Sequence, residues 1–345
     1  MPLVRAVSCV RCSAPLQCVD TTFAVIGCVV HKQEWISQFH SLAWTLSQKQ
    51  KMSSNTSLGN GAELNKTYPA FALIFGSVTV LGLPLNALSL WILLCRHRVT
   101  SPNIVFMVNL AVSDLLLVIS LPMRVYFYAS GTWPLGNFAC VCTRMLFLNN
   151  IRSSSILITF ISVDRLLAVV YPLRSRLLRT STNAWRAVVL LWLFVVGLNL
   201  PESAEFYKSL SVLNGSNCFE YKRKGDVYPT VYVHIALVFT MLAVNLVCTA
   251  MVSWTLRRHL KESSRVNNKL KVMVIYIMNL MMFSIFILPY SLVVFFEKGH
   301  VYIKQLTCLA SFNCCLDPLL YYFSFDGFWK KEEDVEIPRQ ENRFR

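Results

Sequence analysis

The chain has 345 residues, of which 55% are hydrophobic and only 15% are charged, and its mean hydropathy is +0.49. This composition leaves too little polar surface to cover a soluble globule of that length, so it excludes an ordinary soluble domain and requires a bilayer. The formal net charge of +15 does not indicate a nucleic-acid partner, because the basic residues stand at the ends of apolar runs and form no single basic face.

The first 68 residues precede the first long apolar run and are expected to form an extracellular tail. Residues 21–30 resemble a short signal-peptide core, but they lie far from the first residue and lack a clean small-residue cleavage site. Met52 opens a short segment that carries two Asn-x-Ser/Thr sequons before the first apolar run. We therefore expect translation in the cell to start at Met52, with residues 1–51 as a poorly ordered or artefactual extension.

Seven apolar runs follow, and each is long enough to cross a bilayer, which takes about 20 residues. Short connections that contain charge or clusters of Pro, Gly, Asn and Ser separate them. The runs are 69–95, 103–128, 139–170, 185–204, 228–256, 270–296 and 303–325. The fold class is therefore an all-α membrane protein, a seven-transmembrane helix bundle over 69–325. Residues 326–345 are expected to form a short amphipathic interfacial helix and a cytoplasmic tail.

The orientation in the membrane follows from charge and from glycosylation sequons. Lys and Arg gather in the connections after the first, third and fifth runs, for example at Arg96, Arg174 and Arg257, and the positive-inside rule places these connections in the cytoplasm. Three Asn-x-Ser/Thr sequons fall on the opposite side, at Asn55, Asn65 and Asn214. Both signals predict an extracellular N terminus.

Polar side chains inside apolar spans are costly, so each is a candidate functional residue. They are Asn86, Asp114, Asn149, Asn150, Arg152, Ser154, Asn313 and Asp317. We expect Asp114 and Asp317 to face an interior cavity, and their oxygen atoms would suit a sodium ion or a proton. The same network is expected to include Asn86, Ser154 and Asn313. The alternative is a hydrogen-bond network with water and no ion. The residues give no role for Arg152.

Several motifs occur in a fixed order along the chain. They are Gly-Leu-Pro-Leu-Asn86, Asn109-Leu-Ala-Val-Ser-Asp114, Asp164-Arg165, Trp192, Pro289-Tyr290 and Asp317-Pro-Leu-Leu-Tyr321. Together they resemble the landmarks of rhodopsin-like (class A) G-protein-coupled receptors. This resemblance implies a disulfide bond between Cys140 and Cys218 that holds the second outer loop over the cavity mouth, with Cys142 as the nearby rival of Cys140.

The resemblance also implies a path of activation. Asp164 and Arg165 would hold the resting state, Arg165 would then meet the heterotrimeric G protein, and Tyr321 would move inward in the active state. Pro289 and Phe283 are further candidates on this path, although packing explains Phe283 equally well. The usual aromatic switch of the sixth span is replaced by isoleucine, so that switch is not expected here.

Basic side chains near the outer ends of the spans favour an anionic ligand. Phe147 stands where amine receptors carry an aspartate, which argues against a cationic ligand, and Arg124 follows a proline within the second span. Arginine is suited to paired hydrogen bonds with phosphate or carboxylate. The candidate ligand contacts are Arg124, Tyr126, Arg144, Phe147, Lys222, Arg223 and Lys304. Alternatively, Lys222 and Arg223 form a solvated loop face and Lys304 extends to the interface.

Further motifs, among them Leu-Pro-Met-Arg124 and Asn313-Cys-Cys-Leu-Asp317-Pro, are similar to the branch of this family that holds lysophosphatidic acid and nucleotide receptors. Nucleotide receptors usually follow the Pro-Tyr motif with a His and a basic residue, where this chain has Ser291 and Val294. The resemblance therefore implies a plasma-membrane receptor for an anionic lysophospholipid.

The partners implied are a heterotrimeric G protein, an anionic lysophospholipid ligand and membrane lipids, with no nucleic acid. No cofactor is expected apart from a candidate sodium ion at Asp114, and no metal site. One alternative ligand is another small anion, a nucleotide or an aromatic carboxylate. A proton-coupled transporter would need paired repeats that are not found. Enzyme motifs of the His-Glu-x-x-His or Gly-x-Ser-x-Gly kind are also missing, so the chain is not expected to be an enzyme.

Overall fold

The computed structural model describes residues 68–95, 99, 101–212, 218–219, 229–258, 266–293 and 299–324. Each of the seven predicted spans is helical there. The helices are α3 (Pro69–Cys95), α4 (Pro102–Ser130), α5 (Gly136–Val170), η1 (Arg174–Leu177), α6 (Ser181–Val212), α7 (Pro229–Arg258), α8 (Val266–Met281), η3 (Met282–Ile287), α9 (Leu288–Leu292), α10 (Gly299–Ser311) and α11 (Asn313–Ser324). The sequons, the predicted interfacial helix and residues 1–51 lie outside the described residues.

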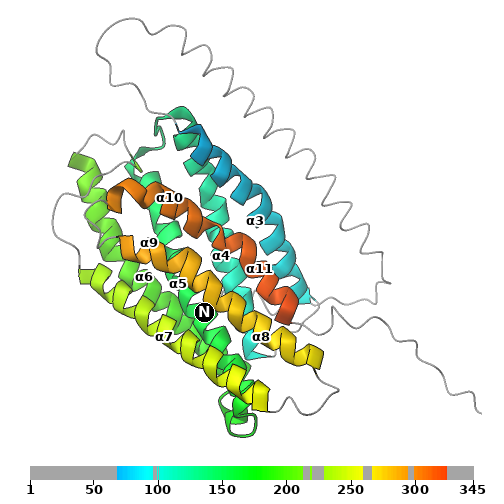
Figure 1. Ribbon diagram of the computed structural model, residues 1–345. Coiled ribbons are helices and arrows are strands. Elements are labelled where there is room, and N and C mark those ends of the chain that lie inside the picture. Colours follow the sequence, from blue (N-terminus) through cyan, green and yellow to red (C-terminus); the bar gives the residue numbers. More distant parts are fainter. Residues whose placement is uncertain are drawn as a thin grey trace, which may run out of the picture. The chain divides into compact units, whose positions relative to one another are not determined.

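The helices pack side by side as one bundle (Figure 1). The long helix α5 contacts α4, α6, α7 and α8, while α3 packs on α4 and also on α10 and α11 at the other end of the chain. In the most apolar stretch of α4, 78% of the residues are buried, against 28% in α3 and in α7. The second span is therefore an inner helix of the bundle, whereas the first and the fifth are peripheral.

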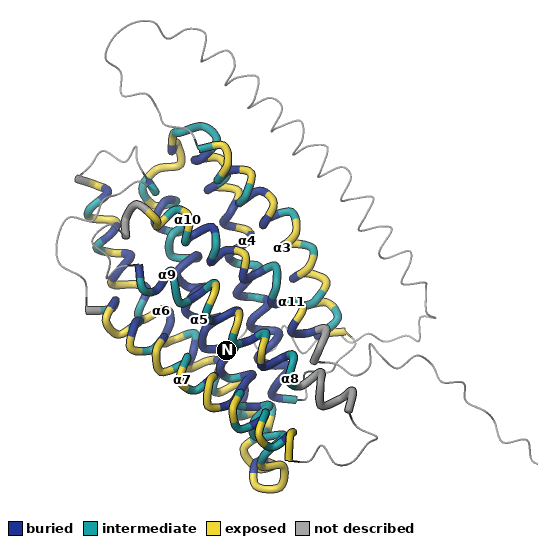
Figure 2. The backbone as a smooth tube through the Cα atoms, in the orientation of Figure 1, coloured by how far each residue is buried: buried dark blue, intermediate teal, exposed yellow. Residues whose placement is uncertain are grey.

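The outward faces of the outer helices are exposed (Figure 2), and many of the side chains there are large and apolar. Large side chains such as Leu73, Trp91 and Leu193 are 59–66% exposed there. Six of the described helical segments are long and apolar enough to cross a membrane. The seventh span is interrupted at Phe312 between α10 and α11. An apolar outer surface on a bundle with a polar interior is the arrangement that lipid requires, so the predicted fold class is confirmed.

Local sequence explains where helix α4 begins and ends. The hydroxyl of Ser101 accepts from the backbone N–H of Ile104, and Pro102 occupies the first turn, where its missing N–H costs nothing. At the other end Gly131 takes a left-handed conformation, with φ 71°, and donates its N–H to the carbonyl of Phe127. These caps fix the length of the helix that carries Arg124.

The fourth span is longer than its predicted range of 185–204, because α6 runs from Ser181 to Val212. Pro201 lies within this helix without ending it. Membrane helices tolerate such prolines, since neighbouring groups satisfy the carbonyl that loses its hydrogen bond. The helix therefore continues past Glu202 to Phe206, and both side chains lie on its outer half.

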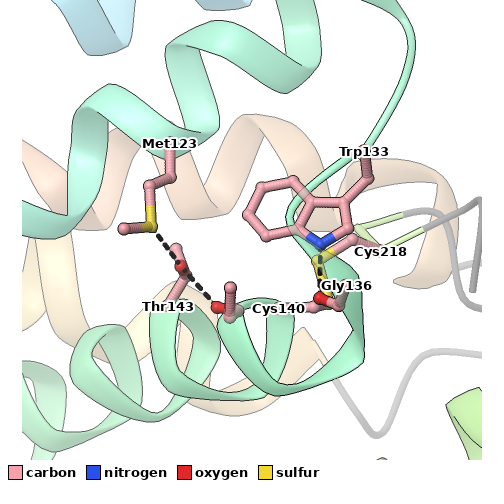
Figure 3. The surroundings of a disulfide bond; sticks show 7 residues. Met123, Trp133, Gly136, Cys140, Thr143 and Cys218 are labelled. Carbon is pink, nitrogen blue, oxygen red and sulfur yellow. Dashed lines mark hydrogen bonds between the residues drawn. A yellow bond between two sulfur atoms is a disulfide. The ribbon is translucent and has the colours of Figure 1, made fainter.

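The predicted disulfide bond joins Cys140, near the start of α5, to Cys218 in the segment that follows α6 (Figure 3). The two Cα atoms lie 5.7 Å apart. Cys142, the rival partner, is a free thiol. Beside the bond, the indole N–H of Trp133 donates to the carbonyl of Gly136 at 2.7 Å. The cross-link places the neighbouring residue Phe219 above the second span.

Candidate ligand site and polar networks

Arg124 is a buried cation surrounded by aromatic rings. Its side chain points into the bundle from α4, and the residue is only 4% exposed. The guanidinium carbon lies 4.5 Å from the ring centre of Phe219, 4.9 Å from that of Phe147 and 5.9 Å from that of Phe75. Such contacts stabilise a cation but do not neutralise it.

No carboxylate pairs with Arg124 among the described residues, and its Nε atom is buried without a hydrogen-bond partner. A buried charge without a counter-ion is unfavourable, so an anion placed here would stabilise the site. The geometry therefore supports the prediction of an anionic ligand at Arg124.

Phe219 comes from the outer loop and covers the arginine. Its ring stacks on Tyr128 at 6.2 Å and meets Trp133 edge-on at 5.5 Å. The disulfide bond holds the adjacent Cys218, so the position of this ring is tied to the covalent structure of the outer end. Phe219 could not be predicted as a site residue, because it lies outside every apolar run.

Arg144 and Arg152, both on α5, share one carboxylate. The Nη2 atom of Arg144 donates to Oε1 of Glu202 at 2.8 Å, and Nη2 of Arg152 donates to Oε2 at 2.7 Å. Arg152 also donates to the amide oxygen of Asn199. Arg152 thus has a clear structural role, and Arg144, predicted as a ligand contact, also forms an ion pair with Glu202.

The other predicted ligand residues are only partly brought together. Phe147 is 1% exposed and its ring meets Tyr290 edge-on at 5.1 Å, so both belong to the Arg124 cluster. The ammonium nitrogen of Lys304 lies 3.8 Å from the ring centre of Tyr68, at the outer end of the bundle. Lys222 and Arg223 lie outside the described residues.

Tyr126 does not join this cluster. It is 46% exposed and stands two residues after Arg124, which corresponds to a rotation of about 200° around a helix. The structure therefore puts it on the opposite face of α4. The sequence could not distinguish these faces, because aromatic residues are frequent on both.

His234 on α7 was also missed at the sequence level. Its ring lies 3.2 Å from the hydroxyl of Ser291, measured from Nε2 to Oγ, which links the fifth span to the sixth. A search for ionisable groups inside apolar runs would have found both His234 and Glu202, since each lies within a predicted span.

Asp114 lies at the centre of a second polar network, deeper in the bundle. The amide nitrogen of Asn150 donates to Asp114 at 2.9 Å and to Ser154 at 3.3 Å. Asn313 donates to Asp317 at 2.9 Å, and both of these side chains are buried. These bonds join Asp114 to Asn150 and Asn313 to Asp317.

Asn86 borders this network without bonding to its carboxyl groups. Its amide nitrogen donates to the backbone carbonyl of Cys314 at 2.6 Å and so ties the first span to the seventh. Several buried oxygen atoms of the network have no hydrogen-bond partner: Asn86 Oδ1, Asp114 Oδ2, Asn150 Oδ1, Asn313 Oδ1 and Asp317 Oδ1. Unpartnered oxygen atoms in one small region fit a hard cation such as sodium.

At the C-terminal end of α5, the carboxylate of Asp164 is held by Arg179 of the following loop. Nε and Nη2 of Arg179 donate to its two oxygen atoms at 2.9 and 3.1 Å. This bond raises the pKa of Arg179 above its usual value. Asp164 is thus tied to the segment that follows α5, and the sequence did not suggest Arg179 as its partner.

The other predicted activation residues lie in the core between the third, sixth and seventh spans. Phe283 is fully buried, and Tyr321 is 4% exposed with no hydrogen-bond partner for its hydroxyl. Phe283 lies in the π-helical turn η3. Helix α9, which contains Pro289, follows this turn directly. π-Helical turns are often found at functional positions, which makes this part of the sixth span a candidate hinge.

Comparison with known proteins gives one matching family. The model of the 7 transmembrane receptor (rhodopsin family) matches residues 85–321. The lysophosphatidic acid receptor 6 of Mus musculus is 33% identical over 304 residues, covering 80% of this chain and 87% of that protein.

Two further relatives extend the comparison. The lysophosphatidic acid receptor 5 of Bos taurus is 34% identical and covers 77% of this chain and 78% of that protein. The P2Y purinoceptor 8 of Gallus gallus is 29% identical and covers 77% and 80%. Relatives named as lysophosphatidic acid receptors and as a purinoceptor thus match the chain over most of its length.

Proposed function

Because the chain belongs to the rhodopsin family of seven-transmembrane receptors, we propose that it is activated by lysophosphatidic acid or a closely related anionic lysophospholipid and that it couples to heterotrimeric G proteins. The chain is a multi-pass membrane protein and a receptor, not an enzyme. We place it in the plasma membrane with its N terminus outside, in agreement with the position of the basic loops.

The buried, unneutralised Arg124 is the observation that carries this proposal. A phosphate monoester has a charge between about −1.5 and −2 at neutral pH and offers several acceptor oxygens to one guanidinium group. Phe75, Phe147 and Phe219 around the arginine provide apolar surface for a glycerol or acyl segment. A lysophospholipid combines both requirements in one molecule.

The test is G-protein activation in cells that express the chain, with three classes of anion compared: lysophosphatidic acid, nucleotides and small aromatic carboxylates. We expect a saturable response to lysophosphatidic acid alone, with untransfected cells as the control. A response to nucleotides would instead favour the chemistry suggested by the name of the purinoceptor relative. Silence toward every anion at normal surface expression would reject the ligand assignment.

For the inner network we propose a sodium ion between Asp114 and Asp317 in the resting state. An ion that binds one packing of the helices opposes a ligand that favours the other, and the coupling is reciprocal. Replacing choline chloride by sodium chloride at constant ionic strength should lower agonist potency at least about fivefold. In Asp114→Asn this dependence on sodium should vanish. An equal dependence in both receptors would argue against a sodium site at Asp114.

A further inference from the structure

We infer that Glu202 and Phe206 of α6 are positioning residues that hold Arg144 toward the ligand head group, and that Arg152 belongs to the scaffold. This inference rests on the proposed function, because it concerns the same ligand site. It separates two arginines on one helix that the sequence could not tell apart.

Arg144 is held from α6 by two different contacts. Its Nη2 donates to Glu202 at 2.8 Å, and its guanidinium carbon lies 4.5 Å from the ring centre of Phe206. Glu202 and Phe206 are four residues apart, so they lie on the same face of α6. The carboxylate fixes one edge of the guanidinium group and the ring supports the group itself.

This arrangement leaves much of Arg144 available. Its side chain is 32% exposed, and its other N–H groups make no hydrogen bond to any described residue. An arginine has five N–H donors, so a ligand oxygen could bind without displacing Glu202. Arg144 is thus oriented in advance, which reduces the entropy lost on binding.

Arg152 is in the opposite situation. Its side chain is 5% exposed, and its two terminal nitrogens are engaged by Asn199 and by the other oxygen of Glu202. Two of its five N–H groups are used in this way, and burial of the side chain keeps the remaining ones, the unpartnered Nε among them, away from a ligand. Glu202 therefore neutralises Arg152 inside the bundle and at the same time orients Arg144 at its edge.

Arg144 also lies close enough to Arg124 to contribute to one head-group site. Phe147 lies one helical turn after Arg144 on α5, and its ring centre is 4.9 Å from the guanidinium carbon of Arg124 and 5.1 Å from the ring of Tyr290, which carries a hydroxyl group. A phosphate bound beside this hydroxyl would meet two cations from two helices. Its charge of nearly −2 would then be matched better than by Arg124 alone.

The decisive variant removes the carboxylate of Glu202, which holds Arg144, without changing the net charge of the site. The cluster of Arg144, Arg152 and Glu202 carries a net charge of +1, and the double change Arg152→Gln with Glu202→Gln keeps this value. We expect the double variant to raise the half-maximal concentration of lysophosphatidic acid about tenfold, and Phe206→Leu to raise it about threefold. Both effects should disappear when Arg144→Gln is already present.

A merely structural role would give a different pattern. Loss of bundle stability would add to the effect of Arg144→Gln, whereas loss of positioning cannot act on an absent arginine. Unchanged potency in both variants, or effects that persist on the Arg144→Gln background, would overturn the inference. If the double variant does not reach the cell surface, the pair Phe206→Leu and Arg144→Gln decides alone.

Glu205→Gln is the matched control, because Glu205 lies on the same helix and forms an exposed ion pair with Lys208. It should respond like the unchanged receptor. If neither the unchanged receptor nor Glu205→Gln responds to lysophosphatidic acid, the proposed function fails and the inference fails with it. If both respond, and if the double variant (Arg152→Gln with Glu202→Gln) and Phe206→Leu respond equally well, only the inference fails.

Discussion

Cells that express Arg124→Ala are expected to lose the response to lysophosphatidic acid while the receptor still reaches the surface. Loss of a buried, hydrogen-bonded charge pair at an interface costs about 2–5 kcal/mol, which corresponds to a rise of roughly 30- to 5,000-fold in the half-maximal concentration. The effect should be large because Arg124 is 4% exposed and has no carboxylate partner among the described residues. The measurement is a concentration-response curve normalised to surface expression.

Two further variants distinguish charge from geometry at this position. Arg124→Lys keeps the charge but loses the planar fork, so it should recover only part of the potency. Lys208→Ala removes an exposed cation elsewhere on the outer half and should leave potency within about twofold. A full response from Arg124→Ala would show that Arg124 has a structural role and that the anion binds elsewhere.

The Glu202→Gln variant is expected to be strongly destabilised. Glu202 and Arg152 are only 7% and 5% exposed in their side chains, so the single change leaves a buried cation without its counter-ion. Breaking such a pair costs about 3–5 kcal/mol. The thermal unfolding midpoint of the purified, detergent-solubilised receptor should fall by several degrees, and surface expression should fall with it.

The double variant provides the internal comparison. Changing Arg152 to glutamine together with Glu202 removes both buried charges, and it should recover most of the stability that Glu202→Gln alone loses. Glu205→Gln changes an exposed ion pair on the same helix, so its free energy of unfolding should lie within about 1 kcal/mol of that of the original receptor. Equal stability of Glu202→Gln and the original receptor would contradict a buried counter-ion at Glu202.

The sequence predicted the membrane-spanning architecture well, because a bilayer imposes a simple rule. A span needs an apolar run of fixed length, and all seven predicted runs are helical in the structure. The same rule makes a charge such as Arg124 or Asp114 stand out. The burial of these two side chains could therefore be predicted from the amino-acid sequence alone.

Pairings across helices could not be predicted, because they depend on how each helix is rotated and how far it extends. Glu202 meets Arg144 and Arg152 only because α6 continues past Pro201. Arg179 reaches Asp164 only through the path of the inner loop. The amino-acid sequence names these residues, but it does not give the distances between side chains on different helices and loops.

The ring of Phe219 over Arg124 has a consequence for the speed of ligand binding. A head group that diffuses into the outer end cannot collide with a guanidinium group that is 4% exposed, so the ring or the arginine has to move first. Association that requires such a rearrangement is slower than a simple encounter, and the observed rate reaches a plateau at high ligand concentration. The same closure slows escape, so the receptor should combine slow onset with a long residence time of its agonist.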